Sequence, residues 1–224
     1  VAATGFNKDP FSARIVDRLT DDALVDLLYK DVTRGIEGTG VCAGVLKASS
    51  TLNAISSTAD RVFAAVAAVH RQTGIPISTH TEAGTMALEQ IARFERHGVA
   101  LDRVIIGHLD RKLDAAYLKA VAETGVYMGF DQISKTKYAP DEARVSAIKA
   151  LVEAGHGRQL LLSGDLARRS YWPAYGRLYG PGFAYILQRF IPWLHAEGLP
   201  ASVLDDLLIH NPARALPVRP ARPR

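Results

Sequence analysis

Four residues that can do chemistry follow short apolar runs at widely spaced points of the chain: Lys47, His80, His108 and Asp165. Two imidazoles and a carboxylate form the ligand set that zinc and similar divalent metals prefer. A lysine ammonium cannot bind a cation, so Lys47 joins such a set only as a neutral amine or as the anionic carbamate formed with CO₂. A carbamate has two oxygens and can bridge two metals. Together the four residues predict a metal centre.

Each of these residues also has a simpler interpretation. A single histidine at a strand end is more often a hydrogen-bonded structural residue than a ligand, and a strand-end aspartate such as Asp165 commonly caps the next helix. Lys47 could form a Schiff base in a metal-free lyase, or it could simply be solvated. A shared site is favoured because the pattern repeats at four strand ends. The other histidines are interpreted as structural or surface residues: His70, His97, His156, His195 and His210.

The elements that would position these residues are short β-branched runs that alternate with longer amphipathic stretches. Strands are expected at 1–3, 41–48, 75–79, 103–107, 125–130 and 159–163, and helices at 20–36, 57–73, 85–98, 112–123 and 141–155. This alternation predicts an α/β protein with a parallel sheet built from βα units. In a parallel barrel the carboxyl ends of the strands share one face, and that face carries the active site.

The last third of the chain departs from this rhythm. Residues 166–181 form a long connection, and a loop of more than about 12–15 residues is usually functional or disordered. Two closing helices are expected near 182–197 and 201–209. We expect the barrel domain to occupy residues 1–212 and a disordered Pro/Arg-rich tail to occupy residues 213–224.

Composition restricts the class of protein. The chain has 224 residues, of which 48% are hydrophobic and 22% are charged, as in an ordinary globular protein. The formal charge is +4, but the last eleven residues contain four arginines and no acid, so the remainder has no net charge. A neutral body gives no case for a nucleic-acid partner.

Cysteine use and hydropathy point to a cellular setting. Cys42 is the single cysteine, which excludes an internal disulfide and a multi-cysteine zinc site. No apolar run approaches the roughly 20 residues that span a bilayer. We therefore expect a cytoplasmic protein with a small-molecule substrate, no nucleic-acid or membrane partner, and a homodimer as the candidate assembly.

Several segments resemble, in order and spacing, the strand motifs of the phosphotriesterase family in the amidohydrolase superfamily. The segments are Ala43–Lys47, Pro76–Thr81, Val104–His108, Gly129–Asp131 and Leu162–Asp165, with further matches at Ala2–Gly5, Gly35–Thr39 and Asn211–Arg214. The likeness covers nearly the whole chain except the tail. Within the family, Asp165–Ser170 is most similar to the phosphotriesterase homology branch, also called phosphotriesterase-related proteins.

The resemblance implies a TIM-type (β/α)₈ barrel with a two-metal centre, usually of Zn²⁺. Lys47 would be an N6-carboxylysine that bridges the ions, and His80 and His108 would bind the more exposed ion. Asp165 would bind the more buried ion and accept the proton of the bridging hydroxide. Such a centre lowers the pKa of bound water to about 7 and polarises the bond to be cleaved. The implied activity is hydrolysis of an ester, lactone, amide or phosphotriester bond.

The sequence departs from the family pattern in three places. The family carries a His-X-His motif at the end of the first barrel strand, and no such motif occurs in this chain. We therefore expect an N-terminally truncated barrel that contains strands 3–8. Gln132 stands where phosphotriesterases proper often carry a histidine, and Arg111 stands where they carry an acid. These two differences weaken the specific case for phosphotriester hydrolysis.

The substrate face is expected along residues 132–138 and the connection 166–181. The candidate substrate-binding residues are Gln132, Tyr138, Arg168, Arg169 and Trp172. The arginines favour an anionic or carbonyl-rich substrate. A catalytically incomplete remnant or a binding protein stays open as the alternative to an enzyme, because the His-X-His ligands are missing.

Overall fold

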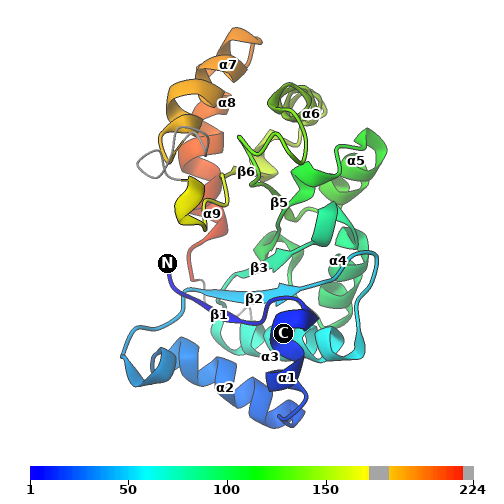
Figure 1. The fold of residues 1–224 in the computed structure, drawn as a ribbon, viewed down its shortest axis with the longest axis vertical. Helices are drawn as coiled ribbons and strands as arrows, with labels where there is room; N and C mark the ends of the chain where they lie inside the picture. The colour runs from blue at the N-terminus through cyan, green and yellow to red at the C-terminus, as the bar shows by residue number, and fades with distance from the viewer. Residues whose placement is uncertain (172–181, 219–224) are drawn as a thin grey trace.

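Six parallel strands form the centre of the computed structural model, which describes residues 1–171 and 182–218 (Figure 1). The strands are β1 (Ala3–Gly5), β2 (Val45–Ser49), β3 (Ile77–His80), β4 (Val104–Ile106), β5 (Tyr127–Phe130) and β6 (Leu160–Leu162). Each strand pairs in parallel with the next along the chain. All six carboxyl ends therefore lie at one edge of the sheet, as the sequence predicts.

Helices follow the strands and cover the sheet. They are α1 (Asp9–Val16), α2 (Asp21–Thr33), α3 (Ser57–Thr73), α4 (Ala87–Arg96), α5 (Ala115–Glu123), α6 (Asp141–Glu153), α7 (Ile191–Ala196), α8 (Ala201–Asp205) and α9 (Asn211–Ala215). Short π-helical stretches, Ile186–Phe190 and Asp206–His210, lead into α7 and α9. Figure 1 shows α7, α8 and α9 beside β6, at one end of the sheet.

Local signals explain where the helices begin and end. The Thr20 hydroxyl accepts a hydrogen bond from the amide of Ala23 at 3.2 Å, and Ser56 caps α3 in the same way at 3.0 Å. A cap of this kind stabilises a helix by about 1 kcal/mol. Gly74 ends α3 in the left-handed conformation, with φ 70°, which glycine adopts without steric cost.

The core lies between the sheet and the helices that cover it. Phe63 of α3 and Phe94 of α4 are fully buried, and their rings meet edge to face with centroids 5.1 Å apart. Burial of one such side chain contributes about 1.5–3 kcal/mol. This contact holds α3 and α4 against each other, beside the loops that follow β2 and β3.

The sheet contains six strands within the described residues, which is the number expected for strands 3–8 of the barrel, and β1 does not pair with β6 there. Two features differ from the expectations. Helix α1 was not predicted. Residues 213–215 belong to α9 and Ala215 is buried, so the predicted disorder does not hold for these three residues.

The described residues contain no helix that is both long enough and apolar enough to cross a membrane.

Candidate metal centre

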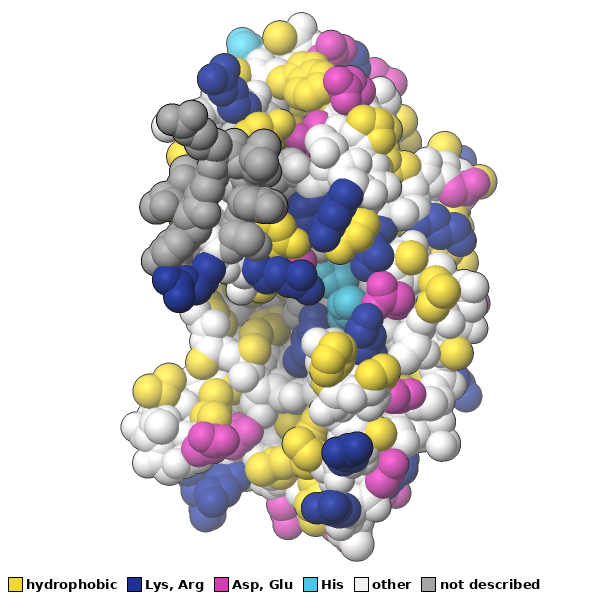
Figure 2. Space-filling model, viewed as in Figure 1, with side chains coloured by type: hydrophobic (Ala, Val, Ile, Leu, Met, Phe, Trp, Pro, Cys, Tyr) yellow, Lys and Arg dark blue, Asp and Glu magenta, His cyan; other side chains and the backbone are white. Residues whose placement is uncertain are grey.

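The structure brings Lys47, His80, His108 and Asp165 to the same end of the sheet. Lys47 is the third residue of β2 and His80 is the last residue of β3. His108 and Asp165 follow the ends of β4 and β6 by two and three residues. Figure 2 shows histidine side chains in a hollow that Lys and Arg side chains surround.

The two histidines are in direct contact. Their rings meet edge to face, with centroids 4.6 Å apart and an interplanar angle of 82°. Burial and the neighbouring His108 lower the pKa of His80 to about 4. The ring of His80 is therefore neutral at neutral pH, and neutral imidazole is the form that binds a metal.

The amine of Lys47 interacts electrostatically with Asp131, Asp165 and His80. Burial lowers the pKa of its amine, and the charges of Asp131 and Asp165 oppose that shift. The neutral amine is the form that reacts with CO₂, so burial favours the carbamate that could bind a metal. No three His, Cys, Asp or Glu side chains in residues 1–171 and 182–218 are grouped so as to hold an ion by themselves. His80, His108 and Asp165 alone therefore do not make a metal site, and a divalent metal would need the carbamate of Lys47 as a further ligand.

Asp131, which directly follows β5, orients His108. Its Oδ1 lies 2.5 Å from Nδ1 of His108, and its Oδ2 accepts a hydrogen bond from the His108 amide at 3.0 Å. A histidine that donates one ring N–H to a carboxylate has the other nitrogen available for a metal. Asp131 therefore leaves Nε2 of His108 as the donor nitrogen.

Two of the predicted ligands have strained backbones. His108 has φ 63° and Asp165 has φ 44°, although neither residue is glycine. Such conformations cost about 1–3 kcal/mol and cluster at functional sites. At Gly107, an added Cβ would lie 2.5 Å from the Thr79 carbonyl oxygen and 3.2 Å from Asp131 Oδ2. Glycine is needed there because a Cβ would clash with the Thr79 carbonyl oxygen of the neighbouring strand, and it also leaves room for Asp131 beside the backbone.

Lys135 and Gln132 hold the carboxylate of Asp165. Lys135 Nζ donates to Asp165 Oδ2 at 2.6 Å and to its carbonyl oxygen at 2.7 Å, and Gln132 Nε2 donates to the same Oδ2 at 3.0 Å. Although burial acts to raise it, the pKa of Asp165 is lowered by these hydrogen bonds. Asp165 is therefore ionised at neutral pH. Its Oδ1 accepts no hydrogen bond from the described residues.

The predicted substrate-binding residues take different places. Gln132 is 2% exposed and bonds to Asp165 beneath the mouth. Tyr138 is 40% exposed, and the guanidinium of Arg111 lies 4.3 Å from its ring centre. Arg168 and Arg169 are exposed near the end of β6. Trp172 lies outside the described residues.

A buried ion-pair network holds the loop between β5 and α6. Arg144 Nε donates to Asp110 Oδ2 at 2.8 Å, and Arg144 Nη1 donates to Asp141 Oδ1 at 2.9 Å. The same Asp110 oxygen accepts the amide of Gln132 at 2.9 Å, and the carbonyl oxygen of Lys135 accepts from Arg144 at 3.4 Å. The network thus fixes the backbone of the two residues that hold Asp165. Sequence reasoning missed it, and also missed Lys135 and Glu82, because no local pattern marks the partner of a charge.

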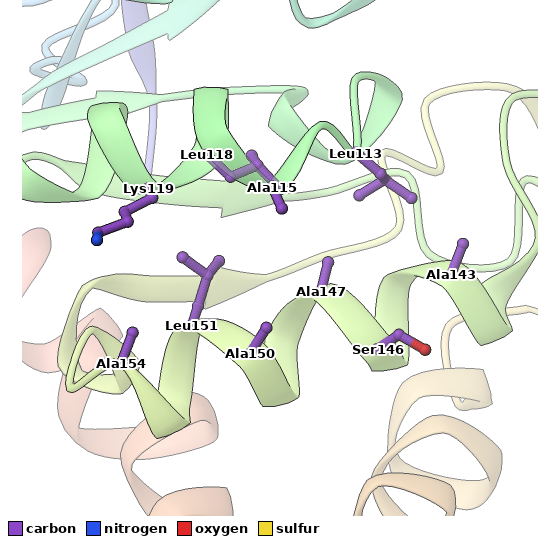
Figure 3. Close-up of a pocket in the computed structure, with 10 residues that line it drawn as sticks. All are labelled: Leu113, Ala115, Leu118, Lys119, Ala143, Ser146, Ala147, Ala150, Leu151 and Ala154. Carbon is purple, nitrogen blue, oxygen red and sulfur yellow. The ribbon is translucent and has the colours of Figure 1, made fainter.

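Two cavities differ in their chemistry. A cavity of about 280 Å³ adjoins Asp165, between Ile133 and Tyr185. A larger groove of about 580 Å³ runs between α5 and α6, where leucine and alanine side chains face each other (Figure 3). The larger groove contains none of the predicted ligands, so it is not part of the candidate site.

Comparisons with known proteins show the family of the chain. The model of the Phosphotriesterase family matches residues 1–216. The Phosphotriesterase homology protein of Escherichia coli (strain K12) is 38% identical over 215 residues, which cover 96% of this chain and 73% of that protein. A crystal structure of the E. coli protein, complexed with phosphate in its active site, has a TM-score of 0.93 at 37% identity, covering 97% of this chain and 74% of that one.

A further relative is named for its substrate. The Phospho-furanose lactonase of Mycoplasmopsis synoviae (strain 53) is 31% identical over 234 residues, which cover 96% of this chain. The match covers 66% of that relative, so the chain spans slightly less than two thirds of its length.

Proposed function

The chain belongs to the phosphotriesterase family, and from this premise we propose that it is a metal-dependent hydrolase that opens the ester bond of a lactone. The observation that carries the proposal is the convergence of Lys47, His80, His108 and Asp165 at the carboxyl edge of a parallel sheet. Lys47, as a carbamate, would hold two Zn²⁺ ions together with the histidines and Asp165. When bound, such a centre supplies an activated water and polarises the carbonyl oxygen of the substrate.

Asp165 is suited to act as the general base. Lys135 and Gln132 both donate to its Oδ2, which leaves Oδ1 to accept a proton from the attacking water. The lowered pKa of Asp165 keeps the carboxylate ionised before the reaction. Lys135 also restrains its backbone oxygen, so the acceptor is held in place as the proton moves.

Cations at the mouth favour a substrate with an anionic substituent. Lys135 lies 4.9 Å from the ring centre of Tyr171, and Lys137 lies 3.5 Å from the Tyr171 hydroxyl. Arg168 is exposed three residues after Asp165. One relative is named a phospho-furanose lactonase and another holds phosphate in its active site. We therefore propose a phosphorylated sugar lactone as the substrate class, with its phosphate near these cations.

A binding protein that holds a metal without turnover is the second candidate. The observation that favours it is the lack of a His-X-His motif in this sequence. It predicts that the chain binds Zn²⁺ and a phosphorylated lactone and releases the lactone unchanged.

The deciding experiment measures hydrolysis by the purified chain after chelation and after reconstitution with Zn²⁺. Three substrates are compared: an aldono-1,4-lactone, its 5-phosphate and an aryl dialkyl phosphate. We expect the highest kcat/KM for the phosphorylated lactone, loss of activity on chelation and recovery with Zn²⁺. Activity that survives chelation contradicts the metal centre. Zn²⁺ binding without turnover of any of the three supports the binding protein.

A further inference from the structure

The carboxylate of Glu82 contacts residues from three different strand-to-helix segments at the mouth of the site. Glu82 begins a short 3₁₀ turn, Glu82–Gly84, directly after β3. Its Oε2 lies 3.3 Å from Nε2 of His80 and also accepts from the ammonium of Lys8, which precedes α1. Its Oε1 accepts from Arg111 Nη1 at 3.1 Å, in the turn after β4. The segments that follow β1, β3 and β4 therefore meet at Glu82.

Glu82 differs from an ordinary surface ion pair. Exposed pairs contribute about 0–1 kcal/mol, because solvent screens them and the side chains lose entropy. The Glu82 side chain is only 21% exposed and has three partners. Arg111 is held in turn by the ring of Tyr138 at 4.3 Å. Its two oxygens face an ammonium, a guanidinium and an imidazole, which is the surrounding of an ionised carboxylate.

An ionised carboxylate decides which nitrogen of His80 carries the proton. A carboxylate only accepts hydrogen bonds, so the Nε2 that faces Glu82 must be the protonated nitrogen of the neutral ring. Nδ1 then keeps its lone pair. The arrangement at His108 is reversed, because Asp131 faces Nδ1 and leaves Nε2. The two histidines thus offer different nitrogens, and each is set by its own acid.

We propose that Glu82 is a positioning residue for His80. It holds the Nε2–H tautomer, keeps Nδ1 available for a metal, and joins this ring to the pair formed by Arg111 and Tyr138 at the mouth. The effect on metal affinity rests on the proposed function, whereas the effect on the tautomer concerns the chain alone. Because Glu82 has two oxygens, one side chain links the histidine to residues beside the substrate.

The first test reads the tautomer of the metal-free protein. Nitrogen-15 NMR of the histidine rings, recorded at neutral pH, compares the wild type with Glu82→Gln. The glutamine amide keeps the size of the side chain, but it can either accept or donate. We expect the Nε2–H form of His80 in the wild type and a mixture of both tautomers in the variant. Asp60→Asn is the matched control, since it removes an exposed carboxylate that pairs with Arg93 on the outer helices.

The second test measures Zn²⁺ affinity by competition with a chromogenic chelator. Loss of an acid that orients a ligating histidine typically weakens metal binding by about 10–100-fold, and we expect this loss for Glu82→Gln and for Glu82→Ala. Asp60→Asn should bind Zn²⁺ as the wild type does. Circular dichroism confirms that each variant folds. If Glu82→Gln does not fold, Glu82→Asp replaces it in both measurements.

The outcomes separate this inference from the proposed function. An unchanged tautomer in a folded Glu82 variant overturns the positioning role, and so does an unchanged Zn²⁺ affinity, even if the wild type hydrolyses lactones. The tautomer of His80 can also shift in the Glu82 variant while the wild type binds no Zn²⁺. This outcome supports the positioning role and overturns the metal centre.

Discussion

The ammonium of Lys135 bonds to both the side chain and the backbone of Asp165, at 2.6 Å from Oδ2 and 2.7 Å from the carbonyl oxygen. Lys135 is 6% exposed, so water competes little for these hydrogen bonds. Asp165 also has the positive φ of 44°. A buried cation thus stabilises a strained residue and leaves one of its carboxylate oxygens available.

Replacement of Lys135 should lower the hydrolysis of a phosphorylated lactone more than that of an unphosphorylated one. We expect Lys135→Met to lower kcat/KM for a phosphorylated lactone by at least about tenfold, because a charge-assisted hydrogen bond contributes about 1.5–3 kcal/mol. The loss of kcat/KM should be smaller for the unphosphorylated lactone, because this substrate lacks the phosphate that we place near the Lys135 ammonium. Steady-state kinetics on both substrates check this. Lys119→Met, at an exposed position on α5, is the control. Equal losses on both substrates would argue against a contact with the phosphate.

Replacement of Lys47 should remove bound metal. We expect Lys47→Ala to lose Zn²⁺, with partial recovery when a small carboxylate such as acetate is added, because the acid replaces the carbamate. Lys47→Arg keeps the positive charge but cannot form the carbamate, and it should not recover. Metal content after gel filtration measures both effects. A Lys47→Ala chain that retains its Zn²⁺ without added acid would exclude the bridge.

His70 should make stability depend on pH. Burial lowers its pKa from 6.5, and its Nδ1 lies 2.6 Å from the carbonyl oxygen of Ile75. Because the unfolded chain binds the proton more readily, stability is complete above about pH 6.5 and falls as the pH drops toward the folded pKa. The maximum slope is about 1.4 kcal/mol per pH unit.

His70→Gln should flatten this dependence. The glutamine amide can still donate to Ile75, but it does not titrate. Urea unfolding at several pH values gives the free energy of unfolding of both proteins. The difference between them should change below about pH 6.5, because only the wild type carries the histidine. Parallel curves over that range would show that His70 does not titrate with folding.

The buried network around Arg144 should be costly to break. Arg144→Met leaves Asp110 and Asp141 buried without their cation, and we expect the free energy of unfolding to fall by about 3–5 kcal/mol. Tyr185→Phe removes only the hydroxyl that donates to Asp141 at 2.9 Å, and it should cost about 1 kcal/mol. Arg96→Met on the surface should change stability by less than about 0.5 kcal/mol. Urea denaturation compares the three variants, and equal effects of Arg144→Met and Arg96→Met would contradict this account.

The sequence predicts the sheet and the strand-end residues well, for a physical reason. A buried parallel strand is an apolar run, and the polar residue that ends it is visible in the sequence. Lys47 and His80 are marked in this way. Helix α1 escapes the same reasoning, because Phe11 and Ile15 lie on it with their side chains exposed, 68% in the case of Phe11. Its apolar residues therefore do not mark a buried face.

The partners of the site residues could not be predicted from the sequence. Glu82 contacts Arg111, 29 residues away, and Lys135 contacts Asp165, 30 residues away. Composition and periodicity describe neighbours along the chain, so they identify a charge but not its counterpart. The positive φ values of His108 and Asp165 are equally hidden, because those residue types do not require them.

The close approach at Gly107 has a consequence for how such proteins diversify. Gly107, directly after β4, has no room for even a methyl group beside the Thr79 carbonyl oxygen. The separation of the candidate metal-binding side chains is therefore set by the spacing of the strands, about 4.8 Å. Connections beyond the strands can then change in length and composition without shifting the reactive groups. A single ancestral framework of this kind could acquire new substrates by exchanging its surface segments while its chemistry stayed in place.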